Sequence, residues 1–199
     1  MNAWSADSRD RVALIGLGNA LRGDDAIGLA IADRVVERLS SLGEHDARAC
    51  LDLHRGALDA LAIVAAWSDA AMAIVVDAAV SGAAPGSLHR FELGADAGAE
   101  AGTDRGATPL RTALGSTSSH GLGLAEAIAL GAALGRLPPR LVCFAVEAQG
   151  FDAASGLSRP VENAVHAAVA QIADEIIVAW HHRQLSPPRI PRGARPVTD

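Results

Sequence analysis

An apolar run, VALIGL at residues 12–17, leads at once into a glycine-containing turn and then into an amphipathic pattern. An apolar run without alternation predicts a strand that is buried on both faces. From residue 25 to residue 39 apolar side chains recur every four positions and charged side chains lie between them, which predicts a helix that covers the strand. The apolar positions of this helix are Ile27, Ile31, Val35 and Leu39. A strand–turn–helix unit of this kind is typical of a parallel α/β sheet.

The same alternation continues along the chain. Further strands are expected at residues 47–53, 71–76, 87–93 and 141–146, and further helices at 57–67, at 119–135 and from 158 onward. Because only a short Gly/Pro turn precedes residues 87–93, that strand is expected to be antiparallel or at an edge. A chain of 199 residues suits one domain. The predicted fold is a three-layer α/β sandwich, with a mostly parallel, twisted sheet of about five strands flanked by helices.

Three segments lack this periodicity. Residues 1–10 contain no apolar segment, which argues against a signal peptide, and are expected to be flexible. Residues 94–118 show no period and are expected to form a long loop of functional importance. Residues 184–199 are rich in proline and are expected to be a disordered tail, which leaves residues 11–183 as the folded domain.

Composition indicates which partners and which compartment to expect. The formal net charge is −6 and no Lys/Arg-rich run occurs, which argues against nucleic acid as a partner. The longest weakly polar stretch, residues 121–135, is too short to span a membrane. Cys50 and Cys143 lie in separate apolar runs without a C-x-x-C motif, so both are expected to be buried thiols. These features predict a cytoplasmic protein.

Two adjacent carboxylates, Asp24 and Asp25, end the glycine-containing turn. Such turns usually bind phosphate through backbone N–H groups, but paired carboxylates would repel a polyphosphate. The dinucleotide fingerprint would also need a third glycine where Leu21 stands, and no Walker-type Gly-Lys-Ser/Thr ending follows. The turn is therefore predicted to hold a metal ion or another cationic centre, and nucleotide binding is the disfavoured alternative.

Asp25, Asp77 and His120 are predicted to meet at one edge of the sheet. Each follows a predicted strand or begins a predicted helix, and doubly wound sheets bind ligands at the edge where these positions gather. Two carboxylates and one imidazole are a normal ligand set for nickel or zinc. No Gly-x-Ser-x-Gly or His-Glu-x-x-His motif is present, so hydrolysis would need a water activated by a carboxylate or a metal. His54 faces the same edge and is a candidate substrate contact.

Each of these residues also has a purely structural interpretation. Asp24 or Asp25 could be the N-cap of the first helix, Asp77 could cap a turn, and His120 could lie on the surface of a first helical turn. The residues alone leave both interpretations open. The other histidines are expected to be solvated: His45, His89, His166, His181 and His182.

Four segments together resemble the hydrogenase maturation proteases, the endopeptidases that trim the C-terminus of the large subunit of nickel–iron hydrogenases. The segments are LIGLGNALRGDDAIG at 14–28, VDAA at 76–79 with PGS at 85–87, SHGLGL at 119–124, and VEA with GLS between 146 and 158. The resemblance spans roughly residues 12–178, and the combined motif is far more specific than any single glycine pattern.

This resemblance implies that Asp25, Asp77 and His120 bind a metal, and that Asp25 or Asp77 serves a catalytic water. Many relatives carry Glu at the first of these positions. The implied reaction is cleavage of one peptide bond in the precursor of the large subunit, just beyond its nickel-binding cysteine motif. The implied recognition signal is nickel carried by the precursor, so the purified enzyme need not hold a metal of its own.

The segment DLHRG at 52–56 departs from the family, whose members usually have an Asp-Gly-Gly-Thr or Asp-Leu-Gly-Thr turn there. In the family this turn is associated with recognition of the large subunit, so His54 and Arg55, together with Asn19, are the candidate substrate-binding residues. His and Arg adopt a positive φ less readily than Gly, which predicts an unusual partner or a reshaped turn. The alternative function is a non-catalytic, nickel-binding checkpoint module on the same fold.

Overall fold

A computed structural model describes residues 11–94, 119–153 and 155–184, and for residues 119–122, 183 and 184 it describes the backbone alone. The strands are β1 (Val12–Leu17), β2 (Leu51–Gly56), β3 (Met72–Ala79), β4 (Leu88–Gly94) and β5 (Arg140–Glu147). The helices are the 3₁₀ turn η2 (Gly23–Ala26), α1 (Ile27–Ser41), α2 (His45–Ala49), α3 (Ala60–Trp67), α5 (Ser119–Ala133) and α6 (Arg159–Gln184). The expectations for residues 1–10, 95–118 and 185–199 lie outside the described residues.

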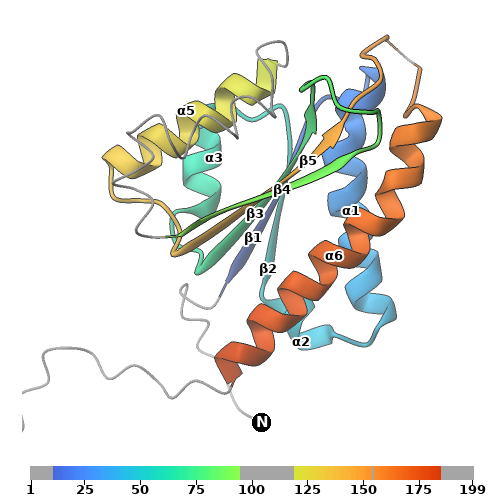
Figure 1. The fold of residues 1–199 in the computed structure, drawn as a ribbon. Coiled ribbons are helices and arrows are strands. Elements are labelled where there is room, and N and C mark those ends of the chain that lie inside the picture. Colours follow the sequence, from blue (N-terminus) through green and yellow to red (C-terminus); the bar gives the residue numbers. More distant parts are fainter. Residues whose placement is uncertain (1–10, 95–118, 154, 185–199) are drawn as a thin grey trace, which may run out of the picture.

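The five strands form one sheet in the order β2-β1-β3-β5-β4 (Figure 1). All neighbouring strands are parallel except β4, which is antiparallel to β5 and lies at an edge. The predicted mostly parallel α/β sandwich, including its antiparallel edge strand, is therefore confirmed.

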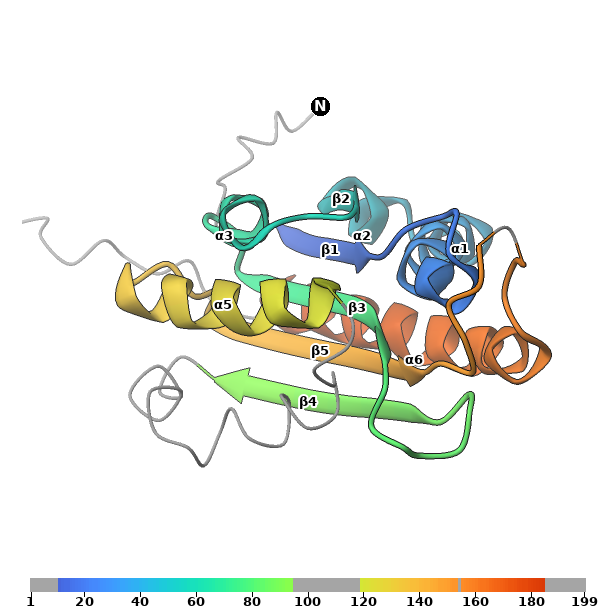
Figure 2. The same ribbon diagram turned by 90° about the horizontal axis from the view of Figure 1, so that it is seen from above.

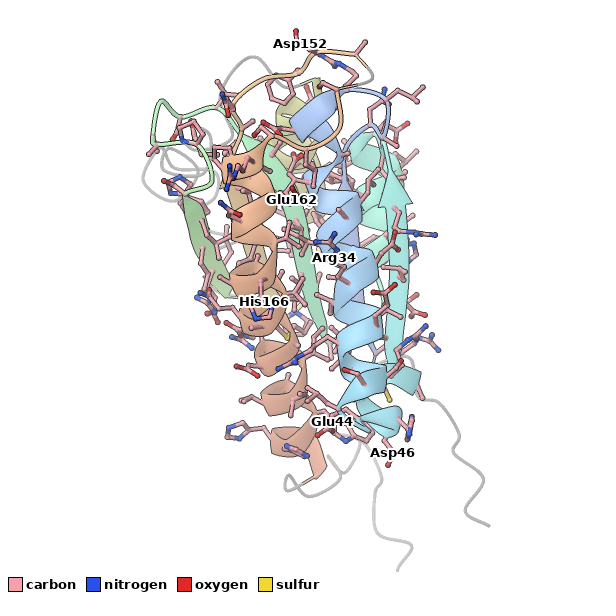
Figure 3. All side chains as sticks on the ribbon, turned by 90° about the vertical axis from the view of Figure 1, so that its right-hand side faces the viewer. Arg34, Glu44, Asp46, Asp152, Glu162 and His166 are labelled. Carbon is pink, nitrogen blue, oxygen red and sulfur yellow. The ribbon has the colours of Figure 1, made fainter. Side chains whose placement is uncertain are left out.

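Helices cover both faces of the sheet, with a separate apolar core under each layer (Figures 1 and 2). On one face α1 and α6 run side by side (Figure 3), and Ile31 and Ile172 pack there against Leu14 of β1. On the other face α3 and α5 contribute Trp67 and Leu124 to the second core. Within the described chain, no helix combines the length and the hydropathy that a membrane crossing would need.

The direction of winding reverses next to β1. The chain passes from β1 to β2 on one side and then returns to form β3 on the other side. The loops that follow β1 and β3 consequently diverge, and a ligand-binding crevice is expected at the C-terminal ends of these two strands. Asp25 lies in the segment that follows β1, and Asp77 lies near the C-terminal end of β3.

Three elements differ from their predicted bounds by three or more residues: α3 begins at Ala60 instead of residue 57, and the strands β2 and β3 differ as follows. The predicted strand at 47–53 begins four residues later, because residues 45–49 form α2 and bury Ala47 in the core. β3 continues to Ala79 instead of ending at residue 76, because it pairs with β5 as far as Glu147. Asp77 therefore lies within a strand, beside Ala145 of β5, and not in a turn.

Helix α1 begins against the ends of β1 and β3. A Cβ added at Gly28 would lie 2.3 Å from the carbonyl oxygen of Leu17 and 2.4 Å from that of Val76. Only a glycine allows this approach, which sets the position of the preceding η2 turn relative to the sheet.

We expect Gly28→Ala to destabilise the protein by about 1–3 kcal/mol, because the methyl group must displace strand backbone. Chemical denaturation followed by circular dichroism measures this change. The matched control is Gly123→Ala in α5, where the new methyl group would meet only the carbonyl oxygen of Leu58 at 3.5 Å. The control should stay within about 1 kcal/mol of the wild type, with a tendency toward greater stability. Equal effects of the two substitutions would contradict the close packing at Gly28.

Candidate functional site

Asp24 joins two loops that are far apart in sequence. Its side chain is 1% exposed. Oδ2 accepts hydrogen bonds from the backbone N–H groups of Gln149 (2.8 Å) and Gly150 (3.2 Å) and from the hydroxyl of Ser158 (2.8 Å). Oδ1 accepts one from the N–H of Ser158 (2.6 Å). This carboxylate therefore ties the loop after β1 to the loop between β5 and α6.

The predicted helix-capping role of the acidic pair is wrong. The N-caps are Arg22 for η2 and Ala26 for α1, and neither makes a side-chain capping bond. The side chain of Asp24 instead binds the loop that follows β5, since that loop offers three backbone N–H donors and one hydroxyl donor.

Asp25 is buried directly next to this anchor, with 1% of its surface exposed. Its backbone carbonyl packs against Gly18, where an added Cβ would lie only 1.8 Å from the Asp25 oxygen. Gly18 has φ 136°, a value that favours glycine. The tight turn and the Asp24 anchor together hold Asp25 at the C-terminal end of β1.

Asp77 lies on β3, the strand next to β1, and is also 1% exposed. Its Oδ1 accepts a hydrogen bond from the N–H of Ala78 (2.8 Å), whereas Oδ2 is buried without a hydrogen-bond partner in the described part of the chain. Burial raises the pKa of Asp77 to about 7; the bond from Ala78 opposes this, and the negative charge of Asp25 adds to it. The two predicted carboxylates thus lie close enough to influence each other's charge.

His120 is the second residue of α5. Figure 2 shows α5 beginning at the end of the sheet where β1, β3 and β5 terminate. Asp77 is on the sheet face that α5 covers, because its strand neighbours Val75 and Ala79 both belong to the core under that helix. The side chain of His120 lies outside the described residues, so its place in the trio stays a prediction.

The carboxylate pair is chemically suited to a divalent cation. A buried carboxylate is normally paired or bound to a metal, and Oδ2 of Asp77, which has no hydrogen-bond partner among the described residues, fits the role of a metal ligand near the charge of Asp25. Among the residues with described side chains, no three His, Cys, Asp or Glu side chains are grouped to hold a metal. The predicted third ligand, His120, is not among those residues.

The predicted substrate-binding residues are spread over two faces. Oδ1 of Asn19 accepts a hydrogen bond from the N–H of Leu21 (2.9 Å) and so shapes the tip of the loop after β1. Arg55 forms an ion pair with Asp33 of α1, on the face opposite to Asp77. The structure therefore does not bring Arg55 together with the carboxylate pair.

Residues 52–56, where an unusual partner or a reshaped turn was expected, belong to β2, which runs through His54 and Arg55 to Gly56. His54 pairs with Ile15 of β1, and the positive φ, 136°, falls on Gly56. His54 and Arg55 therefore need no positive φ. Roles for His54, Arg55 and Asn19 in binding substrate stay predictions.

The thiol of Cys143 is buried, as expected, and Cys50 is half-buried; neither is in a disulfide. Burial, and then the negative charge of Asp77, raise the pKa of Cys143 to about 12. This thiol is therefore inert near neutral pH and adds no nucleophile to the crevice.

Sequence reasoning missed two polar residues at the same end of the sheet. Glu147 ends β5 and is 2% exposed. His89 of β4 was expected to be solvated, but its side chain is only 29% exposed and its Nε2 lies 3.8 Å from Oε2 of Glu147. The sequence does contain a signal for His89. It is spaced by two residues from the apolar Phe91, as Phe91 is from Leu93, so all three side chains lie on the face of β4 that joins the core under α5.

We expect Asp24→Asn to destabilise the protein by about 3 kcal/mol, because an amide nitrogen cannot accept hydrogen bonds and leaves buried donors unpaired. Urea denaturation measures the loss. Asp33→Asn is the matched control, because Asp33 makes only an exposed ion pair with Arg55 and should change stability by less than about 1 kcal/mol. A similar small effect of both substitutions would refute the anchoring role of Asp24.

Asp77→Asn should raise stability in a pH-dependent way. The folded protein holds the Asp77 proton more tightly than the unfolded chain, so the wild type loses stability as pH rises from about 4 to about 7. The amide does not titrate, so the variant should be more stable by on the order of 2–4 kcal/mol at pH 8 and nearly equal at pH 4. Melting temperatures from pH 4 to pH 8 test this.

Glu92→Gln is the control, because the pKa of Glu92 is shifted in the direction opposite to that of Asp77. Hydrogen bonds from Arg140 and then Arg90 lower the pKa of Glu92 to about 2, so its stabilising charge is already complete above pH 5. That variant should lose a small, constant amount of stability between pH 5 and pH 8. A pH-independent difference for Asp77→Asn would contradict the raised pKa of Asp77.

Comparison with known proteins gives two kinds of match. A model of the hydrogenase maturation protease family (HycI) matches residues 34–175, which is more than half of the chain. No curated protein sequence matches it. Among solved structures, the hydrogenase maturating endopeptidase HybD from E. coli is 22% identical and has a TM-score of 0.63, over 85% of this chain and 93% of HybD.

Two further solved structures have the same fold. An endopeptidase from Escherichia coli is 21% identical with a TM-score of 0.59, over 87% of this chain and 93% of its own. A hydrogenase 2 maturation peptidase from a Thaumarchaeota archaeon is 26% identical with a TM-score of 0.53, over 83% and 97%. With the family match, the fold and the buried carboxylates at the switch point in view, this chain belongs to the hydrogenase maturation protease family and is a peptidase.

Proposed function

We propose that this protein removes the C-terminal extension from a nickel-loaded precursor of a hydrogenase large subunit. Its family supports a peptidase that acts in hydrogenase maturation. The observation that carries the assignment of the site is the buried, electrostatically coupled pair Asp25 and Asp77 at the switch point of the sheet. Nickel is part of the substrate in this proposal and need not reside in the enzyme.

Asp25, Asp77 and His120 would hold the nickel of the precursor. Two carboxylates and a neutral imidazole suit a borderline divalent ion, and Oδ2 of Asp77 has no hydrogen bond within the described residues that such an ion would have to break. When bound, a divalent ion supplies Lewis-acid polarisation of a nearby peptide carbonyl.

The chain's own residues perform the remaining tasks. Asp25 or Asp77 would accept the proton of the attacking water through a carboxylate oxygen that does not hold the ion. Asp24 keeps its neighbour Asp25 in position, because its hydrogen bonds fix the turn that both residues share. Because both carboxylates are buried, bulk water is kept away from them, which strengthens the electrostatic interactions between them and a bound ion.

The test is incubation of the purified protein with a nickel-loaded large-subunit precursor, followed by mass measurement of the precursor. We expect loss of a short C-terminal peptide, and no such loss from a precursor without nickel. Asp25→Asn and His120→Ala should each slow cleavage by at least about 100-fold, the lower end of what an acid–base or electrostatic group contributes. His166→Ala, exposed on the outer side of α6, should cleave at the wild-type rate.

Three outcomes separate the possible functions. Wild-type cleavage by Asp25→Asn or His120→Ala would show that the carboxylate–histidine trio is wrongly assigned. Nickel-dependent binding without cleavage would favour the checkpoint module. Absence of both binding and cleavage would contradict the proposed substrate.

A further inference from the structure

Glu147 and His89 lie on the same face of the sheet as Asp77. The strand register places Asp77 of β3 beside Ala145 of β5, and Ala145 beside His89 of β4. Side chains that are aligned across neighbouring strands point to the same face of the sheet. Ala145 belongs to the core that α5 covers, so all three residues of this row lie on that face. The row of Asp77, Ala145 and His89 therefore crosses the sheet at the end where β3 and β5 terminate.

Two strand spacings separate Asp77 from His89, which is on the order of 10 Å between Cα atoms. The strand register places only Ala145, with its small methyl side chain, between them in this row, and Ala145 is itself buried. An extended peptide covers such a distance in about three residues.

Glu147 is fixed by the loop between β3 and β4. Its Oε1 accepts hydrogen bonds from the backbone N–H groups of Ser81 and Gly82, both 2.8 Å, and its Oε2 accepts one from the hydroxyl of Ser81, also 2.8 Å. A carboxylate oxygen has room for a further donor beside one hydroxyl. Nε2 of His89 lies 3.8 Å from this Oε2.

His89 has a buried nitrogen without a hydrogen bond. Nε2 is enclosed and has no hydrogen-bond partner within the described chain, although the ring as a whole is 29% exposed. The ring stacks on Phe91, with centroids 6.4 Å apart and an interplanar angle of 22°. A small tilt of the ring would bring Nε2 within hydrogen-bonding distance of Glu147.

We propose that His89, oriented by Glu147, binds the backbone of the peptide that is cleaved at the Asp25–Asp77 centre. This inference rests on the proposed peptidase function and adds a binding position about three residues from the scissile bond. When Nε2–H donates to Glu147, the neutral ring presents Nδ1 as an acceptor. The matching group on an extended peptide is a backbone N–H. His89 is thus a substrate-binding residue and takes no part in the bond cleavage itself.

Three substitutions at His89 separate binding from structure. In His89→Asn the amide group reaches about as far as Nδ1 and keeps an acceptor for the peptide, whereas in His89→Gln it reaches about as far as Nε2 and keeps only a donor for Glu147. His89→Ala removes both. His166→Ala is the matched control, because His166 lies exposed on the outer side of α6 (Figure 3).

The measurement is cleavage of the nickel-loaded precursor at a series of precursor concentrations, with melting temperatures recorded in parallel. We expect His89→Ala and His89→Gln to raise KM by roughly three- to tenfold, the effect of losing one hydrogen bond of ordinary net strength, with kcat nearly unchanged. His89→Asn should restore most of the wild-type KM. His166→Ala should match the wild type in both constants.

Other results would overturn the proposal. If Gln preserved KM better than Asn and the melting temperatures followed the same order, His89 would only support Glu147. A fall in kcat at constant KM would make His89 a catalytic group, and unchanged constants in His89→Ala would exclude any contact with substrate. These failures all occur with a wild type that cleaves, whereas a wild type that neither binds nor cleaves the precursor would refute the proposed function as well.

Discussion

The buried carboxylate of Asp24 organises the whole C-terminal edge of the sheet. Its four hydrogen bonds connect the loop after β1 with the loop after β5, and these loops come from strands that are not neighbours in the sheet. A charge buried in this way is stable only when its hydrogen bonds are complete, so the two loops must adopt their positions together. Gly28 lets α1 pack closely against the ends of β1 and β3, and this packing also fixes the position of the loop after β1.

Asp24 and Asp25 are adjacent in the sequence but have different roles in this arrangement. Asp24 is saturated by protein donors and has an architectural role. Asp25 and Asp77 are both buried at the switch point, where burial and then the negative charge of Asp25 raise the pKa of Asp77. Shifted pKa values are commonly concentrated at functional sites. The two buried carboxyl groups give a physical reason why a positively charged group on a substrate would be attracted to this end of the sheet.

The sequence predicts the architecture well, because apolar periodicity reports burial directly. β1 occupies the predicted residues, and the antiparallel edge strand follows from its short connecting turn. The boundaries of β2 and β3 were wrong because pairing with neighbouring strands sets them, and a local pattern carries no information on pairing. The roles of Asp24 and Asp25 could not be separated either, since the partners of Asp24 lie 125 to 134 positions away.

The site was predictable in part. Asp77 was visible as a carboxylate in an otherwise apolar strand, and Glu147 has the same signature at the end of β5. His89 was overlooked because histidine is common on surfaces, although its place in the alternation of β4 pointed inward. The departure from the family turn at 52–56 was visible in the sequence, but its form was not: this chain continues β2 through His54 and Arg55 and places its positive φ at Gly56.

The most direct test of the account is X-ray absorption at the nickel edge, on the nickel-loaded precursor alone and on a rapidly frozen mixture with an excess of this protein. The account predicts additional oxygen and nitrogen ligands to nickel in the mixture, and their loss when the protein carries both Asp25→Asn and Asp77→Asn. A nickel spectrum that the wild-type protein leaves unchanged, while the precursor is still bound, would contradict the role given to the two buried carboxylates.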